Sequence, residues 1–282
     1  MMASEITLDE KFLELQNAKK PTQNSHPKIQ KVPQNLRNRN KYDNKYSPKA
    51  VSIGPIHHDN KNLKIGDNYK LTLAAKYIQS TQHTPQFLHK KIADNISKLK
   101  DLFADDVLAL VSNSESLQGF RSDEEKLSWL LFVDGCFLLC ILDFDNTQFV
   151  DDEDMSMKFT QLLVQMMTDV LLLENQLPYL VLKLLWKNDN EKELIDKMYY
   201  FLQEWDMAIR DDESRRMPGI LEKLCTIFQK TKQEPAEDLP NEPQPPIHLL
   251  DLQRSTLVGK SKPKEADEIQ EHRRTNHNRN TT

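Results

Sequence analysis

Apolar residues recur at helical spacing along much of the chain. The clearest stripe occupies positions i, i+3, i+4, i+7, i+8 and i+11 of one helix face: Phe159, Leu162, Leu163, Met166, Met167 and Val170. Such spacing predicts an amphipathic α-helix and excludes the period-two alternation of a half-buried strand. Similar stripes predict helices around residues 71–78, 87–103, 194–205 and 220–228.

Two local signals predict where helices begin and end. Ser122 followed by Glu125 forms a capping box, and the helix that it starts should continue into the apolar stretch Trp129 to Leu142. Pro178 lacks an amide donor and disfavours helix at the preceding residue, which predicts a break near Gln176. A new helix should follow the break, with Leu180 and Leu184 on its apolar face.

The pattern changes at both ends of this helical region. Residues 15–50 hold few apolar residues and many Asn, Gln, Lys and Pro, so residues 1–50 are expected to form a flexible arm, with a short helix near Phe12. Val51, Ile53 and Ile56 around Gly54-Pro55 predict a short extended segment closed by a turn. We therefore expect a mainly α, irregular multi-helix domain at 51–232. A Pro-rich acidic linker with a short apolar segment follows at 233–259, and a disordered tail at 260–282.

Composition and charge narrow the possible functions. The 282 residues include only 6 Gly against 14 Pro, which disfavours the tight turns of sheets and of phosphate-binding loops. Residues 1–50 carry ten Lys/Arg and five Asp/Glu, and residues 260–282 carry six and four. The remaining 22 and 34 give the span 51–259 a net charge of −12. An acidic body argues against a nucleic-acid partner, because such proteins concentrate Lys/Arg on one face.

The cysteines and the hydropathy pattern bear on the compartment. Three cysteines, Cys136, Cys140 and Cys225, cannot pair completely, and no signal segment is recognisable at the N-terminus, so a reducing, cytoplasmic environment is expected. The most apolar stretch, Trp129 to Leu142, has 14 residues with Asp134 inside it. It falls short of the roughly 20 residues that span a bilayer, and no transmembrane segment is predicted.

Candidate metal ligands occur without the partners that a site needs. His57, His58 and Asp59 are adjacent, but neighbouring histidines in an extended segment or turn point apart. Cys136 and Cys140 share a helix face and form half of a zinc site at most; burial as small hydrophobes is the favoured interpretation. The acidic cluster from Asp143 to Asp154 lacks the spacing and the central Gly of a calcium loop. We expect no metal and no cofactor.

Asp134 and Glu174 are the most informative ionisable residues, because each lies among residues that otherwise look buried. A buried carboxylate must find hydrogen-bond donors or shift its pKa. A structural role at a broken helix end, with Asn175 and Gln176 as partners, is favoured over general acid catalysis. The chain also lacks GxGxxG, GxxxxGK[ST], GxSxG and a kinase catalytic loop.

Four segments in order resemble the plant domain of unknown function 247 family, also called uncharacterised protein family 0481. They are VSIGPIHH (51–58), VDGCFLL (133–139), LLLENQLPYLVL (171–182) and IHLLDL (247–252). The resemblance implies a plant-restricted, largely helical protein without an established biochemical activity. Typical members are longer and end in a hydrophobic membrane anchor, so it also implies a truncated form here, with the plasma membrane as the location of full-length relatives.

The resemblance singles out motif positions of unknown role and two departures. The positions are Gly54, Pro55, His57, His58, Lys70, Asp134, Gly135, Glu174, Asn175, Gln176, Pro178 and Asp251. The departures are Gly66-Asp67, where the family has a Met-Glu pair, and Cys140, where it has Glu.

Two functional hypotheses follow. The first is a non-enzymatic interaction or signalling module with a protein partner. The alternative is an enzyme that uses Asp134, Glu174 and the pair His57/His58, which requires these side chains to converge in one pocket. If the chain is a truncated product, large exposed apolar patches are also expected.

Overall fold

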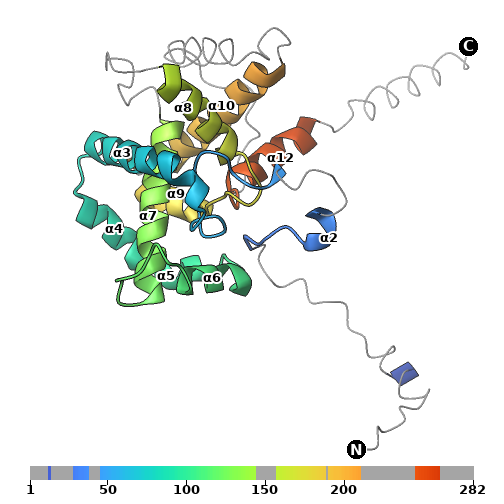
Figure 1. Cartoon of the computed structure of the whole chain (residues 1–282). Helices are drawn as coiled ribbons and strands as arrows, with labels where there is room; N and C mark the ends of the chain where they lie inside the picture. Colours follow the sequence, from blue (N-terminus) through green and yellow to red (C-terminus); the bar gives the residue numbers. More distant parts are fainter. Residues whose placement is uncertain are drawn as a thin grey trace, which may run out of the picture.

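The computed structural model describes residues 12–13, 28–37, 45–143, 157–188, 190–210 and 245–260 (Figure 1). The described residues form helices joined by loops, and the only β-type pairing among them is an isolated bridge between Ile29 and Phe103. The predicted mainly α class is confirmed. The elements are α2 (Gln34–Arg37), η2 (Lys61–Leu63), α3 (Lys64–Ser80), α4 (Pro85–Ala93), α5 (Ile96–Lys100), α6 (Asp105–Ser112), α7 (Asp123–Leu142), α8 (Met157–Val170), α9 (Tyr179–Leu185), α10 (Glu191–Arg210) and α12 (Leu249–Lys260).

Helix α7 is the centre of the molecule (Figure 1). From Leu130 to Leu142 every residue is buried, as expected for a helix that is apolar all round. Helices α3, α4 and α9 make the most extensive contacts with it. The apolar stretch Trp129 to Leu142, which is too short to span a bilayer, thus belongs to the central helix of the core.

The predicted start of α7 is confirmed, with one difference. The Ser122 hydroxyl accepts a hydrogen bond from the Glu125 amide at 3.1 Å, as in a capping box. The Glu125 carboxylate bonds the amide of Arg121, at 2.6 Å, whereas in a capping box it would bond the amide of Ser122. Three acidic residues in the first turn also face the positive end of the helix dipole.

The apolar stripe at 87–103 belongs to two helices, where the sequence predicts one. Helix α4 ends at Ala93 and α5 begins at Ile96. The Asn95 side chain donates to the Lys91 carbonyl at 2.9 Å and so satisfies the end of α4. Leu88 and Ile92 of α4 and Leu99 of α5 nevertheless bury against the same core.

The break near Gln176 is confirmed. Helix α8 ends at Val170, residues 171–178 form a loop, and α9 begins immediately after Pro178. The predicted stripe of α8 is buried at Leu163, Met166, Met167 and Val170. The helix predicted around 220–228 and the linker at 233–244 lie outside the described residues.

Part of the predicted N-terminal arm contacts the helical body. Ile29 and Val32 are buried, and Ile29 exchanges backbone hydrogen bonds with Leu102 and Ala104 at 2.8 and 3.0 Å. Pro48 and Ala50 are buried as well. Residues 28–37 and 45–50 therefore contribute to the described fold.

None of the helices in the described part of the chain combines the length and the hydropathy needed to cross a membrane.

Candidate functional site

The predicted extended segment lies in the interior, where side chains take the place of a neighbouring strand. The Asp169 carboxylate accepts hydrogen bonds from the backbone amides of Lys49, Ala50 and Val51, the last two at 2.6 and 3.0 Å. Asn175 accepts from the Ile53 amide at 2.7 Å and donates to the Val51 carbonyl at 3.1 Å. A buried backbone must pair its polar groups, and here they pair with side chains of the loop and helix end at 169–175.

Lys70 and Asp134 form a buried ion pair beneath this segment. Their side chains are 2.7 Å apart, and both are almost fully buried. The second oxygen of Asp134 accepts from the Gly54 amide at 2.7 Å, and Lys70 donates to the Ser52 carbonyl at 2.9 Å. Burial alone would lower the pKa of Lys70, but Asp134 and then Asp67 raise it above its ordinary value. Lys70 is therefore a fixed cation that cannot act as a neutral base.

Glu174 forms a second cluster on the other side of the turn. One oxygen accepts from the Val32 amide at 2.6 Å, and the other contacts His57 at 3.0 Å and pairs with Arg37. Burial alone would raise the pKa of Glu174, but the bonds from His57, Arg37 and Val32 lower it to about 2. A carboxylic acid with so low a pKa stays ionised and cannot serve as a general acid near neutral pH.

The loop after α8 caps the end of that helix. The Asn175 amide donates to the Asp169 carbonyl, and the Gln176 amide donates to the carbonyls of Val170 and Leu172, the latter two at 2.8 Å. These carbonyls belong to the end of α8 or follow it directly, so the two amides cap this helix end, whereas the sequence analysis expected the carboxylates to do so with the amides as partners. Glu174, in contrast, bonds to the N-terminal segment.

Pro178 and Asp251 join this loop to the last described helix. Pro178 precedes the first residue of α9, and the amide of Tyr179 donates to the Ile247 carbonyl at 2.8 Å. Asp251 accepts from the Ile247 amide at 3.1 Å and pairs with Arg254 at 3.0 Å. Both motif positions therefore shape the junction between α9 and α12.

Two motif glycines allow close packing. Gly54 has φ +71°, and a Cβ there would lie 2.8 Å from the Gln176 carbonyl oxygen. A Cβ on Gly135 of α7 would meet the side chains of Leu185 and Val181 of α9 at 2.5 and 2.7 Å. Pro55 follows Gly54 and is also buried. The turn and the contact between α7 and α9 both depend on the missing side chain.

The two adjacent histidines point to different surroundings, as predicted. His57 contacts Glu174, whereas both ring nitrogens of His58 are buried without a hydrogen-bond partner. Burial lowers the pKa of His58, although Asp134 partly offsets this effect. His58 is thus held neutral next to the charged pair Lys70–Asp134.

The other candidate ligands form no metal site in the described part of the chain. No group of three or more His, Cys, Asp or Glu side chains is arranged there to hold an ion. Cys136 and Cys140 are buried in α7, and burial raises the pKa of the Cys136 thiol. Asp143 is buried and pairs with Lys187 and Lys197. The rest of its acidic cluster and Cys225 lie outside the described residues.

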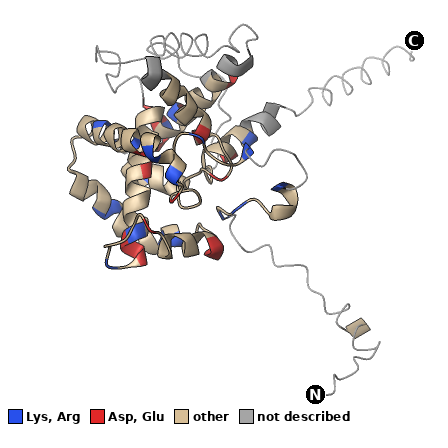
Figure 2. Cartoon of the chain, viewed as in Figure 1, with Lys and Arg blue, Asp and Glu red and all other residues tan. Residues whose placement is uncertain are grey.

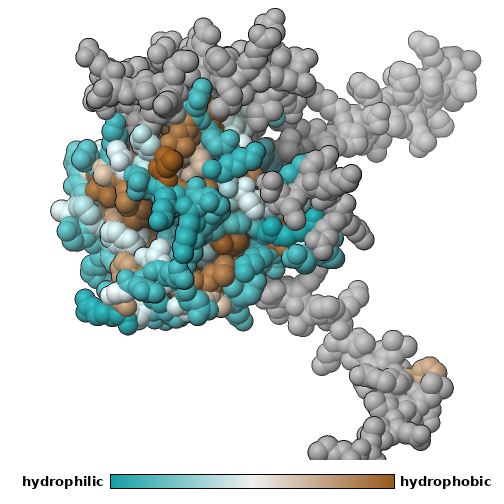
Figure 3. Space-filling model, in the orientation of Figure 1, coloured by the Kyte–Doolittle hydropathy of each residue, from teal (hydrophilic) through white to brown (hydrophobic). Residues whose placement is uncertain are grey.

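An apolar groove, which the sequence analysis did not anticipate, opens on the surface between α3, α4 and α7. It has a volume of about 340 Å³ and is lined by Leu71, Ala74, Ala75, Ile78, Pro85, Gln86, His89, Trp129, Phe132 and Val133. Leu71 and Trp129 are 53% and 40% exposed. Brown surface lies over α3 and α4 in the space-filling view (Figure 3). The sequence signal for this groove was the predicted helix at 71–78, which has more apolar residues than one buried face can hold.

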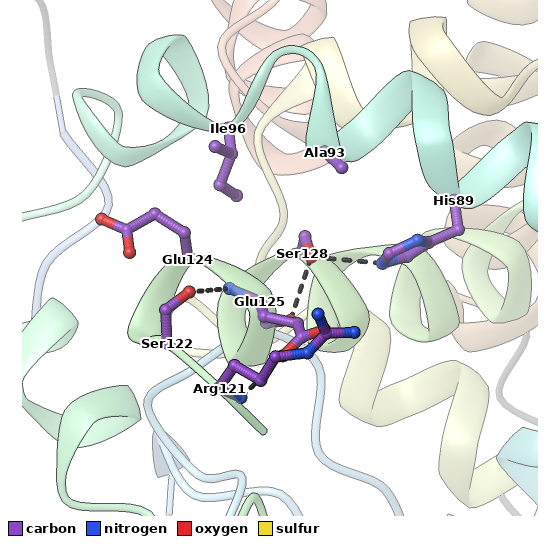
Figure 4. A pocket seen from close by; sticks show the side chains of 8 residues that line it. All are labelled: His89, Ala93, Ile96, Arg121, Ser122, Glu124, Glu125 and Ser128. Atoms are coloured by element: carbon purple, nitrogen blue, oxygen red, sulfur yellow. Dashed lines mark hydrogen bonds and ion pairs between the residues drawn. The ribbon is translucent and has the colours of Figure 1, made fainter.

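A second hollow of about 370 Å³, lined mostly by polar residues, adjoins the groove at the start of α7 (Figure 4). His89 lines both hollows and lies 3.2 Å from the Ser128 hydroxyl, which donates to the Glu125 carbonyl at 2.9 Å. A nucleophilic serine must instead donate its proton to the histidine. Here the Ser128 hydroxyl bonds the Glu125 carbonyl of its own helix, so the contact with His89 links α4 to α7 and does not activate Ser128.

Comparisons with known proteins agree with the resemblance. A family model described as a plant protein of unknown function, the domain of unknown function 247, matches residues 29–282. The UPF0481 protein At3g47200 of Arabidopsis thaliana is 29% identical over 145 residues, which cover 50% of this chain and 27% of that protein. The match thus spans about a quarter of that relative's length. No solved structure matches.

The family match includes the residues of both polar clusters, the extended segment that they hold and the groove above α7. This chain belongs to the plant domain of unknown function 247 family.

Proposed function

We propose that this chain is a non-enzymatic protein-interaction module that binds its partner through the apolar groove between α3, α4 and α7. The observation that carries the proposal is the exposure of Leu71 and Trp129 on a concave surface. Concave apolar surfaces with aromatic anchors are typical of sites that bind a helix or a short peptide.

The polar motif residues support this function indirectly, as a scaffold. Lys70 and Asp134 pair with each other and bond to a backbone carbonyl and a backbone amide, respectively. Glu174 bonds to another backbone amide. Lys70 also belongs to α3, the helix that forms one wall of the groove. Fixing α3 against α7 keeps the groove open in one shape, which lowers the entropic cost of binding.

The alternative enzyme hypothesis gains no support from the geometry. Asp134 and Glu174 contact different parts of residues 52–58 and belong to two separate clusters. The low pKa of Glu174 keeps it from acting as a general acid and makes it a weak base, and the raised pKa of Lys70 keeps it from acting as a neutral base.

We also propose that the module acts in the cytoplasm, as part of the signalling role expected for it. Support comes from the buried free thiol of Cys136, which suits a reducing compartment.

The experiment compares two leucines of similar exposure. Leu71 lines the groove, whereas Leu173, which is 48% exposed, lies in the loop after α8 and is not part of the lining. Purified full-length wild type, Leu71→Asp and Leu173→Asp are each incubated with extract from the source tissue, and captured proteins are quantified by mass spectrometry.

The expected result is a captured protein that Leu71→Asp loses by about tenfold, since placing a charge in an apolar pocket costs more than 1.4 kcal/mol. Leu173→Asp should retain it. The captured protein, once purified, should bind the wild type and Leu173→Asp more tightly than Leu71→Asp. Identical capture by all three proteins would contradict the groove as the binding surface.

A further inference from the structure

The loop between α3 and α4 presents a threonine that is followed by a proline. Thr84 and Pro85 belong to the run 82–87, in which every residue is exposed (Figure 1). Thr84 has extended backbone angles, φ −77° and ψ 151°, and Pro85 is the first residue of α4. An accessible hydroxyl on extended backbone is what a protein kinase needs in order to align it with the γ-phosphate of ATP.

The proline narrows the class of kinase. One class of serine/threonine kinase accepts only substrates with proline directly after the acceptor residue. Its binding site offers no partner for the amide hydrogen that any other residue would bring, and proline has no such hydrogen. The chain contains two sequences of this kind, Ser47-Pro48 and Thr84-Pro85. The fold treats the two differently.

The sequence Ser47-Pro48 is held in place by the body of the protein. Pro48 is buried, and the amides of Lys49 and Ala50 directly after it donate to the Asp169 carboxylate at 3.0 and 2.6 Å. A kinase binds this sequence only after these bonds have opened, which removes donors from a buried carboxylate. The folded protein thus withholds Ser47 from a kinase.

The sequence Thr84-Pro85 opens at a lower cost. The Thr84 hydroxyl accepts a hydrogen bond from the Phe87 amide at 3.2 Å, and this bond is exposed to solvent. The first buried side chain of α4 is that of Leu88. Helix ends open more readily than core elements, so the first turn of α4 can enter a kinase cleft while Leu88 and the core stay in place.

We propose that Thr84 is the phosphorylation site of a proline-directed serine/threonine kinase. The hydroxyl oxygen of Thr84 forms a bond with the γ-phosphorus of ATP, and the bond from that phosphorus to the bridging oxygen of ADP breaks. The hydroxyl proton passes to the catalytic carboxylate of the kinase. ADP leaves, and Thr84 carries a phosphate ester. The inference goes beyond the proposed function, since the site needs no partner in the groove.

The surroundings of Thr84 favour a phosphate. The amides at the start of α4 and the positive end of its dipole attract negative charge. Residues 81–93 contain no Asp or Glu, and Figure 2 shows blue and no red on α4. The phosphate oxygens are stronger acceptors for the Phe87 amide than the hydroxyl that they replace. Because Pro85 and Gln86 line the groove, the modification acts on one of its walls.

The test treats the folded full-length chain with Mg-ATP and a purified mitogen-activated protein kinase, and mass spectrometry locates the phosphate. Thr84→Ala removes the acceptor, and Ser47→Ala is the matched control. Pro85→Ala keeps the acceptor but restores the amide hydrogen, and alanine is well tolerated in a helix. Synthetic peptides of residues 43–53 and 80–90 show how the kinase treats each sequence when no fold holds it. Circular dichroism melts verify that each variant stays folded.

Both peptides are expected to be substrates, whereas the folded chain should gain phosphate at Thr84 at least about tenfold faster than at Ser47. Thr84→Ala and Pro85→Ala should each lose about 90% of the phosphate, and Ser47→Ala almost none. Faster modification of Ser47 in the folded chain overturns the proposal. A folded chain or a peptide 80–90 that gains no phosphate at Thr84 overturns it as well.

The effect of the phosphate on α4 is measured by hydrogen exchange. The amides of Phe87 and Leu88 should exchange about threefold more slowly in the phosphorylated protein than in the unmodified one, because a charged acceptor now holds the first turn. Equal exchange overturns the stabilisation of α4 by the phosphate. Neither assay needs a partner, so their outcomes are independent of the capture experiment with Leu71→Asp.

Discussion

Single carboxylates carry the contacts that hold the extended segment and the N-terminal residues in place. Asp169, Glu174 and Asp134 each direct at least one oxygen at a backbone amide that is distant in sequence. Hydrogen bonds to a charged acceptor are about twice as strong as neutral ones, and a buried donor that loses its acceptor is costly. The protein thus depends on a few acidic residues, each of which serves more than one donor.

Glu174 should make the free energy of unfolding depend on pH in the acidic range. Its pKa is about 2 in the folded protein, against about 4.5 in an unfolded chain, so its contribution is complete above pH 4.5 and is lost as the pH falls to 2. The 2.5-unit difference corresponds to roughly 3 kcal/mol. We expect urea melts at pH 6 and pH 3 to differ more for the wild type than for Glu174→Gln.

The control for this acid dependence is Glu115→Gln, because the side chain of Glu115 is exposed and pairs with Lys61 at the surface. Its melts should show nearly the wild-type difference between the two pH values. Equal pH dependence in the wild type and in Glu174→Gln would contradict the role assigned to Glu174.

At the scale of elements, the segment at 49–54 behaves as a strand without a sheet. Its amides and carbonyls alternate between Asp169, Asn175, Lys70 and Asp134, side chains that project from α8 and the loop after it, from α3 and from α7. The segment therefore joins three helices that a short loop alone would leave unlinked. Its rigidity follows from the number of independent partners.

Removal of the Asp169 carboxylate should loosen this element before any other. Asp169→Ala leaves the amides of Ala50 and Val51 buried without an acceptor, at an expected cost of about 3 kcal/mol. Hydrogen exchange should accelerate at residues 49–51 while the amides of α7 remain protected. Asp105→Ala, at the exposed first turn of α6, is the control and should cost about 0.5 kcal/mol. Equal acceleration of hydrogen exchange in α7 and at residues 49–51 would argue against a local role for Asp169.

Helical periodicity predicted α7 and α8 well, because the burial of an apolar stripe is encoded within one helix. The separation of α4 from α5 was missed, since an Asn that caps a helix end leaves the apolar spacing intact. Asp134 and Glu174 were recognised as unusual because of their apolar neighbours. Asp169 was not, because it falls between the stripe residues of α8 and its role depends on residues 49–51 far along the chain.

The groove is a second feature that the sequence alone does not predict. Apolar spacing at Leu71, Ala75 and Ile78 shows that a face of α3 avoids water, but not which surface covers that face. In the structure the core takes Leu73, Ala74 and Tyr77, and the other stripe remains exposed. Only the packing of α3 on α7 determines which of the two apolar stripes is buried.

For the whole molecule, the N-terminal residues 28–37 act as a strap across the helical body. They contact the turn after α5 through Ile29 and the loop after α8 through Val32 and Arg37. These contacts connect the N-terminal residues to two loops that lie far along the chain.

Two truncations should separate this strap from the residues before it. Deletion of 1–27 is expected to leave the urea midpoint unchanged, since Ile29, Val32 and Arg37 remain. Deletion of 1–38 removes two buried side chains and two partners of Glu174, and should lower the free energy of unfolding by at least about 4 kcal/mol. A common midpoint for both truncated proteins would show that the strap contributes nothing to stability.

The strap also sets an order of events during synthesis. The amide of Val32 finds its acceptor 142 positions later, in Glu174. At about 5–20 residues per second, a ribosome needs roughly 7 to 30 s to reach that residue. During that interval Val32 and the segment at 49–53 have left the ribosome without their acceptors in Asp169, Glu174 and Asn175. The nascent chain is thus most exposed to aggregation, and to chaperone binding, until the loop after α8 emerges.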